Sequence, residues 1–230
     1  MEVKLASLLA GAAAATGTVV IIDVFRAFTT AAVAFSRGAR RIIMVDSLER
    51  ALALRSAGQG DLCIGERGGG KPDGFDFGNS PAELSIAEVA GKTLIQSTTN
   101  GTAGIAAAHR AERVYAGALV TAEATVAAIL RHAPVLVTLV AIGRQGAARA
   151  DEDELCALYL RSRLEGRRPS IPAIQDLLTT MTPPPDAPLV ASGEYDLRDR
   201  EIAAHIDRSP FAIRVRKENE LLIAEPERSR

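Results

Sequence analysis

The feature that most constrains the fold of this chain is an alternation of short apolar runs with polar or glycine-rich breaks, most of them followed by a helical pattern. The runs are almost continuously hydrophobic, which is typical of parallel strands covered by helices on both faces. The sequence therefore predicts an α/β fold with a mostly parallel sheet flanked by helices. The predicted strands are residues 19–22, 42–45, 62–64, 93–96, 113–116 and 135–142.

Capping signals mark helices between the predicted strands. Asp46 and Ser80 are each followed by a glutamate three residues later, which is typical of a capping box at a helix start. Longer helices are predicted at residues 121–132 and 151–165. The second of these opens on four acidic residues, which suit the positive end of a helix dipole.

The pattern changes after Gly166, where prolines become frequent. A chain of 230 residues suits one large domain. We therefore expect a core of residues 1–166, which holds the predicted crevice, and a C-terminal extension of residues 167–230 that packs on or completes the same domain. The extension is predicted to contain helices at 173–181 and 197–206, a connector around 183–185, and a β-hairpin of residues 211–215 and 221–224 that turns at Glu218 and Asn219.

Composition argues against several classes of protein. Lys and Arg number 27 and Asp and Glu 28, so the net charge of −1 provides no field that attracts nucleic acid or an anionic membrane. Residues 5–22 carry no charge, but much of that run is Ala, Gly and Thr, which favour membrane insertion only weakly. We therefore expect no nucleic-acid partner, no membrane association and a cytoplasmic location. Cys63 and Cys156 lack a metal-binding spacing and are predicted to be buried free thiols.

Chemistry-bearing residues follow four of the predicted strands. In an open parallel sheet, ligands bind outside the carboxyl ends of the strands, so these residues are expected to share one crevice. The carboxylates of Asp23 and Glu66 are oxygen donors suited to Mg²⁺. The turn before a predicted helix at 103–110 could hold phosphate oxygens, and Arg26 could clamp them. The residues at this rim are Asp23, Arg26, Glu66, Arg67, Thr98, Thr99, Asn100, Gly101, Thr102 and Arg144.

Simpler interpretations exist for each of these signals. An aspartate after a strand is often only a helix cap, and a Thr-Thr-Asn-Gly sequence is often only a turn. The glycine-rich loop at 68–80 is predicted to be a lid or binding loop, and the alternative is a disordered connector. Residues 65–71 fit the pattern G-x-x-x-x-G-K, but Pro72 follows where a P-loop needs Ser or Thr, which argues against an NTPase.

Taken together, five motifs resemble the 2-phosphosulfolactate phosphatase family. Their order and spacing match jointly, and the resemblance extends from about residue 19 to residue 160. The motifs are DVFRA at 23–27, GER at 65–67, GFDFGNSP at 74–81, TTNGT at 98–102 and ED at 152–153.

The resemblance implies an α/β, Mg²⁺-dependent phosphatase that hydrolyses 2-phospho-3-sulfolactate to 3-sulfolactate and phosphate, a step in coenzyme M biosynthesis. It adds candidate residues from the third and fifth motifs to those of the rim. The residues carried over are Asp23, Arg26, Glu66, Asn79, Ser80, Thr99, Asn100, Thr102, Glu152 and Asp153.

In the mechanism that we expect, Asp23 and Glu66 bind the metal, and Glu152 or Asp153 positions water or adds a metal ligand. The sulfonate of the substrate needs a second cationic pocket, for which Arg67, Lys71 and Arg144 are candidates; the alternative is that these are solvated loop charges. Two other functions stay open: a phosphatase for another small phosphorylated hydroxy acid, and a non-catalytic anion-binding module on the same scaffold. A homo-oligomer also stays open, because the alanine-rich helices and the C-terminal hairpin could form a subunit interface.

Overall fold

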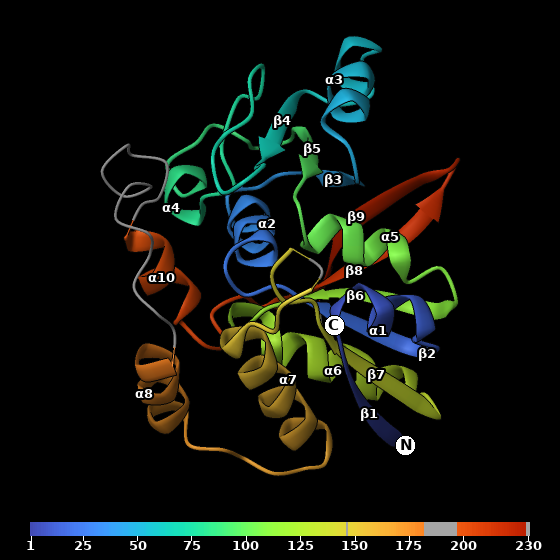
Figure 1. Cartoon of the computed structure of the whole chain (residues 1–230), viewed down its shortest axis with the longest axis vertical. Helices are drawn as coiled ribbons and strands as arrows, with labels where there is room; N and C mark the ends of the chain where they lie inside the picture. Colours follow the sequence, from blue (N-terminus) through green and yellow to red (C-terminus); the bar gives the residue numbers. More distant parts are fainter. Residues whose placement is uncertain (146, 182–196, 229–230) are drawn as a thin grey trace.

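A computed structural model describes residues 1–145, 147–181 and 197–228 of the chain (Figure 1). The connector expected around residues 183–185 lies outside the described residues. Nine strands form one sheet, in the order β1-β7-β2-β6-β8-β9-β3-β5-β4. The strands are β1 (Glu2–Ser7), β2 (Gly17–Ile22), β3 (Arg41–Val45), β4 (Leu62–Gly65), β5 (Thr93–Ser97), β6 (Ala111–Gly117), β7 (Leu136–Ala141), β8 (Phe211–Glu218) and β9 (Leu221–Arg228).

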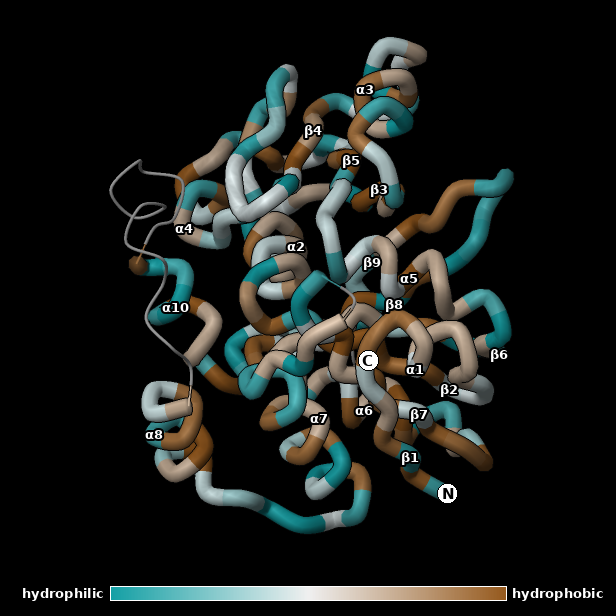
Figure 2. Tube along the Cα trace, viewed as in Figure 1, coloured by the Kyte–Doolittle hydropathy of each residue, from teal (hydrophilic) through white to brown (hydrophobic). Residues whose placement is uncertain are grey.

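The sheet consists of two parallel parts that the C-terminal hairpin joins. Strands β1, β7, β2 and β6 are parallel to one another, as are β3, β5 and β4. Strand β8 pairs antiparallel with β6, and β9 pairs antiparallel with β3. The predicted α/β fold with a mostly parallel sheet is therefore confirmed. The hairpin lies in the middle of this sheet, and its hydrophilic tip appears in teal in Figure 2.

Helices cover both faces of the sheet. Successive residues of a strand point to opposite faces of the sheet and belong to different hydrophobic clusters. The cluster on one face includes residues of α1, α2 and α5, and the clusters on the other face include residues of α3, α6 and α7. Among the described helices, none combines the length and the hydropathy that a membrane-spanning segment requires. The helices are α1 (Leu8–Ala14), α2 (Ala27–Ser36), α3 (Leu48–Ser56), α4 (Pro81–Leu84), α5 (Gly101–Ala107), α6 (Ala122–His132), α7 (Asp151–Leu164), α8 (Ile171–Met181) and α10 (Arg198–Ala203), with a 3-10 turn at Leu119–Thr121.

Several predicted boundaries differ from the observed ones. The helices predicted at 103–110 and 197–206 are Gly101–Ala107 and Arg198–Ala203, and two further differences concern a helix cap and a turn. Helix α3 is capped by Ser47 rather than Asp46, because Ser47 has an extended backbone and its hydroxyl accepts a hydrogen bond from Arg50 N at 3.1 Å. The hairpin turns at Asn219 and Glu220, one residue later than predicted, and both residues have positive φ.

Two elements were not predicted at all. Strand β1 is an edge strand whose residues are exposed or only partly buried, so it lacks the continuous apolar run that marks the inner strands. Helix α1 follows it directly, inside the uncharged stretch of residues 5–22. The pairing of β1 with β7 therefore extends the predicted sheet by one strand.

The helix start at Ser80 is confirmed, and the reciprocal bond of the expected capping box has a different partner. Ser80 Oγ accepts from Glu83 N at 3.1 Å, while Glu83 Oε2 accepts from Gly78 N at 2.8 Å rather than from the backbone of Ser80. Both cysteines are buried and free, as predicted.

Gly65, the last residue of β4, tests how closely the strand ends are packed. Its φ is 151°, and a Cβ at this position would lie 1.9 Å from the carbonyl oxygen of Ser97 on β5. We expect Gly65→Ala to lower the free energy of unfolding by about 3 kcal/mol or more, because the clash is with backbone. Gly58→Ala is the control: φ is 71° there, but no atom lies within 4 Å of the new Cβ, so we expect a loss of only about 1 kcal/mol. Thermal unfolding of both variants gives the comparison, and equal losses would contradict it.

Candidate active site

One cavity of about 490 Å³ opens at the carboxyl ends of the parallel strands. Loops that follow β2, β4, β5 and β7 all contribute to it, so groups distant in the sequence share one crevice. Both predicted metal-binding carboxylates, Asp23 and Glu66, are in its wall. The lining residues are Asp23, Phe25, Arg26, Glu66, Arg67, Gly68, Gly69, Asn79, Thr99, Asn100, Arg144 and Gln145.

The connection between β5 and α5 brings the two parts of the sheet together at this cavity. Helix α5 leaves β5 and packs against α1 and β2 in the other part. Its first residue, Gly101, lies so near the loop after β2 that a Cβ there would be 2.9 Å from Asp23 Oδ2 and 2.6 Å from Ala27 Cβ. Gly101 therefore contributes to the site by having no side chain, which permits this close approach.

Asp23 is the most perturbed carboxylate in the cavity wall. It is 6 % exposed, and its Oδ1 accepts a hydrogen bond from Ala27 N at 3.0 Å. Burial, with smaller contributions from the nearby charges of Glu66 and Glu152, raises the pKa of Asp23 to about 7 against the opposing effects of the Ala27 N–H and Arg26. Because the charged form is so disfavoured here, a cation beside Asp23 would stabilise it.

Glu66 joins the glycine loop after β4 to the turn after β5. Its Oε1 accepts from Thr99 N at 2.6 Å, and its Oε2 accepts from Thr99 Oγ1 and Gly69 N, both at 3.1 Å. The same loop is anchored further along by Phe75, which is 6 % exposed and belongs to the hydrophobic cluster between α3 and the sheet. Of the loop at 68–80, Gly68, Gly69 and Asn79 line the cavity.

The hydroxyl groups of the turn at 98–102 are used within the protein. Thr98 N donates to Thr102 Oγ1 at 2.9 Å, and Thr102 N donates to Thr98 Oγ1 at 3.1 Å. Both side chains are buried, and neither lines the cavity. Their position does not support the expectation that they hold phosphate. They instead fix the shape of the turn.

Two amide side chains in the lining have unpartnered oxygens. Asn79 Oδ1 and Asn100 Oδ1 are both buried and accept no hydrogen bond from the described residues. A buried polar atom without a partner is costly, so these oxygens would gain from accepting a hydrogen bond from a ligand or from coordinating its bound ion.

Two of the three arginines of the lining, Arg67 and Arg144, differ in how firmly they are held. Arg67 donates to Glu66 O at 2.7 Å, and to Asp46 O and Ser97 Oγ at 2.9 Å, so it ties together the ends of β3, β4 and β5. The side chain of Arg144 is 51 % exposed and approaches Glu152 Oε1 only at 3.4 Å. Arg144 is therefore the less restrained of these two. Lys71 is not among the lining residues.

The acidic pair at the start of α7 has two different environments. Asp153 Oδ1 accepts from Val24 N at 2.8 Å and its Oδ2 accepts from Gly143 N at 3.0 Å, so its carboxylate ties the loop after β2 to the loop after β7. Burial, and next the charge of Asp23, raise the pKa of Asp153 well above its usual range. Each oxygen accepts one backbone N–H, which gives Asp153 a positioning role, and its role as base or metal ligand stays a prediction. Glu152 is also buried and acts on the cavity through its charge.

Sequence reasoning did not single out the lining residues Phe25, Gly68, Gly69 and Gln145. It also missed Asp199 on α10, which contacts the lining residue Arg26. Asp199 is fully buried and accepts hydrogen bonds from Arg26 Nη1 at 2.9 Å and from Ser80 Oγ at 2.7 Å. Ser80, predicted to bind substrate, thus caps α4 and contacts Asp199 instead of lining the cavity. No pattern in the sequence marks Asp199, because an aspartate between two arginines is typical of an exposed helix.

The oxygen donors of the cavity suit a magnesium ion that keeps part of its water shell better than they suit a metal whose ligands all come from the protein. No group of three or more His, Cys, Asp or Glu side chains that could hold a metal occurs in the described residues. Mg²⁺, however, usually takes one or two carboxylates and fills its remaining positions with water and phosphate oxygens. Asp23, with Asn79 and Asn100 beside it in the lining, and with Glu66 directly or through water, is such a donor set.

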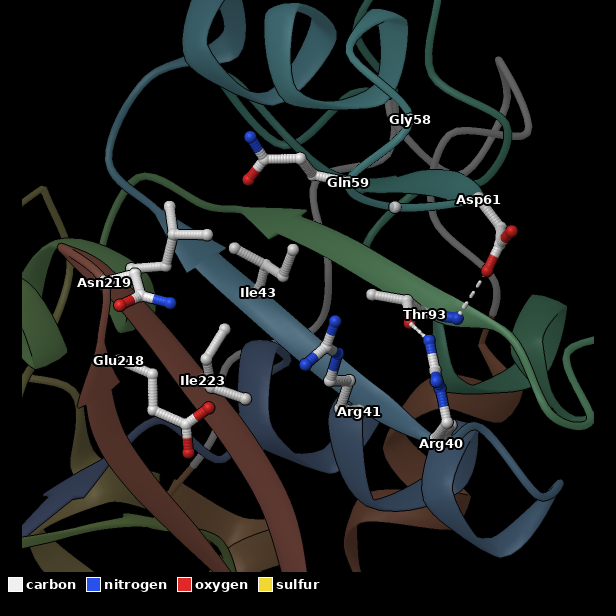
Figure 3. Close-up of a pocket in the computed structure, with 12 residues that line it drawn as sticks. Arg40, Arg41, Ile43, Gly58, Gln59, Asp61, Thr93, Glu218, Asn219 and Ile223 are labelled. Atoms are coloured by element: carbon white, nitrogen blue, oxygen red, sulfur yellow. Dashed lines mark hydrogen bonds between the residues drawn. The ribbon is translucent and has the colours of Figure 1, made fainter.

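A second cavity, of about 240 Å³, lies at the opposite ends of β3 and β5 (Figure 3). There Arg40 Nη2 donates to Thr93 Oγ1 at 2.7 Å, and Asp61 Oδ2 accepts from Thr93 N at 2.7 Å. None of the predicted site residues lines it. The candidate site is therefore the cavity at the carboxyl ends.

Asp153 should contribute strongly to stability. We expect Asp153→Ala to lower the free energy of unfolding by about 3 kcal/mol, because the buried N–H groups of Val24 and Gly143 lose their acceptor. Asp151→Ala, an exposed change in the same helical turn, is the matched control and should cost less than about 0.5 kcal/mol. Chemical denaturation measures both, and similar values for the two variants would contradict the positioning role.

Asp23 should make the metal-free protein less stable as the pH rises. Its folded pKa of about 7 lies above the ordinary value of 3.8, so folding takes up a proton between these values. Stability is then lost, at up to about 1.4 kcal/mol per pH unit, as the pH increases from roughly 4 to 7. In EDTA, the melting temperature of Asp23→Asn should fall less over this range than that of the wild type, while Asp151→Asn should follow the wild type. Parallel curves for Asp23→Asn and the wild type would rule out the raised pKa.

Comparison with known proteins gives several related sequences. Relatives from Thermus thermophilus and Deinococcus radiodurans are each 41% identical, over 135 and 133 residues. These matches cover 58% and 57% of this chain and 56% and 55% of the relatives, so the chain spans just over half of their length. A relative from Parasynechococcus marenigrum is 37% identical over 165 residues, 71% of this chain and 68% of the relative. All three are named probable 2-phosphosulfolactate phosphatase.

A family model described as 2-phosphosulpholactate phosphatase matches residues 5–184, which include the loops after β2, β4, β5 and β7 that line the cavity. Helix α10, which carries Asp199, lies beyond the match. With well over half of the chain matched, the resemblance seen in its motifs is confirmed: the chain belongs to the 2-phosphosulfolactate phosphatase family.

Proposed function

We propose that this protein is a Mg²⁺-dependent phosphatase that hydrolyses 2-phospho-3-sulfolactate to 3-sulfolactate and phosphate, a step in coenzyme M biosynthesis. The observation that carries the proposal is the buried Asp23, whose pKa of about 7 reflects burial beside other carboxylates at a cavity with unpartnered amide oxygens. The family match and the names of the relatives support the choice of substrate. The proposed partner is thus a small phosphorylated anion in the cytoplasm, without nucleic acid.

Phosphoryl transfer depends mainly on positioning and on neutralising charge. Mg²⁺, when bound, supplies charge neutralisation at the phosphoryl group. Ionised Asp23 would hold it, with Asn79 and Asn100 offering further oxygens and Glu66 acting directly or through water. Glu66 accepts hydrogen bonds from Thr99 N and Gly69 N, and it would thereby hold the turn and the glycine loop around a bound phosphate.

The sulfonate end of the substrate requires a separate cation. Arg144 suits this role because its side chain is half exposed at the cavity and only loosely paired with Glu152. Arg67 lines the same cavity but is held by three oxygens of the strand ends, so its contribution would be a fixed positive charge. A substrate with two anionic groups would use both ends of the cavity.

Phosphate release from 2-phospho-3-sulfolactate, measured with Mg²⁺ and with EDTA, tests the proposal. We expect turnover only with Mg²⁺, and a loss on the order of a hundred- to thousandfold in Asp23→Asn, because a charge-stabilising group is removed. Asp151→Asn is the control that should keep wild-type turnover. Raising the Mg²⁺ concentration should move the acidic limb of the pH profile below pH 7, because the ion competes with the proton on Asp23.

The outcomes separate the competing functions. Turnover that resists EDTA would exclude the magnesium role. Faster hydrolysis of phosphorylated hydroxy acids that lack a sulfonate would favour another substrate on the same site. Binding of phosphate without hydrolysis of any member of such a panel would favour an anion-binding module.

A further inference from the structure

Asp199 connects the C-terminal extension to the wall of the candidate site. It lies on α10, which packs against α4 (Figure 1), and its side chain is 0 % exposed. Its Oδ2 accepts from Arg26 Nη1 at 2.9 Å, and its Oδ1 accepts from Ser80 Oγ at 2.7 Å and from Ala82 N at 2.9 Å. One carboxylate from the extension therefore meets the loop after β2 and the start of α4.

The contacts of Asp199 continue into the glycine loop through Arg26. Arg26 is 7 % exposed, and while Nη1 donates to Asp199, Nη2 donates to Gly69 O at 3.0 Å. Gly69 N in turn donates to Glu66 Oε2 at 3.1 Å. The planar guanidinium fixes the angle between its two partners, so the position of Asp199 determines where Gly69 lies in the cavity wall.

We propose that Asp199 is a positioning residue, which holds Arg26 and the glycine loop in place so that the C-terminal extension completes the phosphate-binding cavity. The inference rests on the proposed function only in naming phosphate as the ligand. A buried carboxylate is costly unless it is paired and fully hydrogen-bonded, and Asp199 meets that condition through Arg26, Ser80 and Ala82 together. The same groups explain why Arg26, although at the cavity, is not a mobile clamp.

Asp199→Asn isolates the ion pair. The asparagine oxygen can still accept from Ser80 and Ala82, but its amide group cannot accept from Arg26. We expect backbone amide exchange at residues 68–70 to increase about tenfold or more, because the loop loses its fixed partner. Inorganic phosphate, followed by calorimetry in the presence of Mg²⁺, should bind about tenfold more weakly, as is common when a group that orients a binding residue is removed.

Asp207→Asn provides the matched control. Asp207 also joins the extension to the core, since its Oδ2 accepts from Tyr159 Oη at 2.8 Å and its Oδ1 accepts from Glu123 N at 2.7 Å. It is not among the cavity-lining residues. Amide exchange at residues 68–70 and phosphate affinity should therefore match those of the wild type in this variant.

Either of two results would overturn the proposal: unchanged amide exchange at residues 68–70 in Asp199→Asn, or phosphate binding as tight as or tighter than in the wild type. Tighter binding would mean that Asp199 acts only as a counter-charge that weakens the attraction of Arg26 for anions. If Asp199→Asn does not fold, Arg26→Lys tests the same connection, since an ammonium group lacks the planar fork and exchange at residues 68–70 should again rise. Neither readout requires turnover, so failure of this inference is distinguishable from failure of the proposed reaction.

Discussion

The close contact between the first turn of α5 and the loop after β2 is the constraint on which the site depends. The two parallel parts of the sheet are separated by the β8–β9 hairpin, so the ends of β2 and β5 are not neighbours in the strand order. Because Gly101 has no side chain, α5 can cross to β2 and lie against Asp23. Groups that follow β4 and β5 thereby reach the same cavity as groups that follow β2 and β7.

Buried carboxylates then organise the loops around that cavity. Asp153 holds the loops after β2 and β7, Glu66 holds the turn after β5, and Asp199 holds Arg26. Each accepts from two or more donors, which offsets much of the cost of burying its charge. Asp23 is different, because a single N–H accompanies its burial and the neighbouring acids oppose its ionisation. A carboxylate left in this condition is typical of a functional site, where stability is lower than the fold could provide.

The cavity explains why the phosphate end of the proposed ligand is easier to assign than the other end. Asp23, Glu66 and the amide oxygens are held on loops that the structure fixes, whereas Arg144 is half exposed and weakly paired. Enzymes of one family can therefore share the first set of groups and differ in the second. Asp199 adds a requirement from outside the family match, since it comes from the C-terminal extension.

Sequence patterns alone predicted the α/β class, the inner strands and the set of residues at the carboxyl ends of those strands. These follow from local patterns: apolar runs for covered strands, capping residues for helix starts, and motifs at strand ends. Sequence patterns did not predict β1, whose residues are half exposed, or the roles of individual groups. The folded chain was needed to show that Thr98 and Thr102 bond to each other, that Asp153 and Ser80 position loops, and that Asp199 contacts Arg26. A polar side chain takes its role from the partners that surround it, and the fold sets which partners distant in the sequence come close.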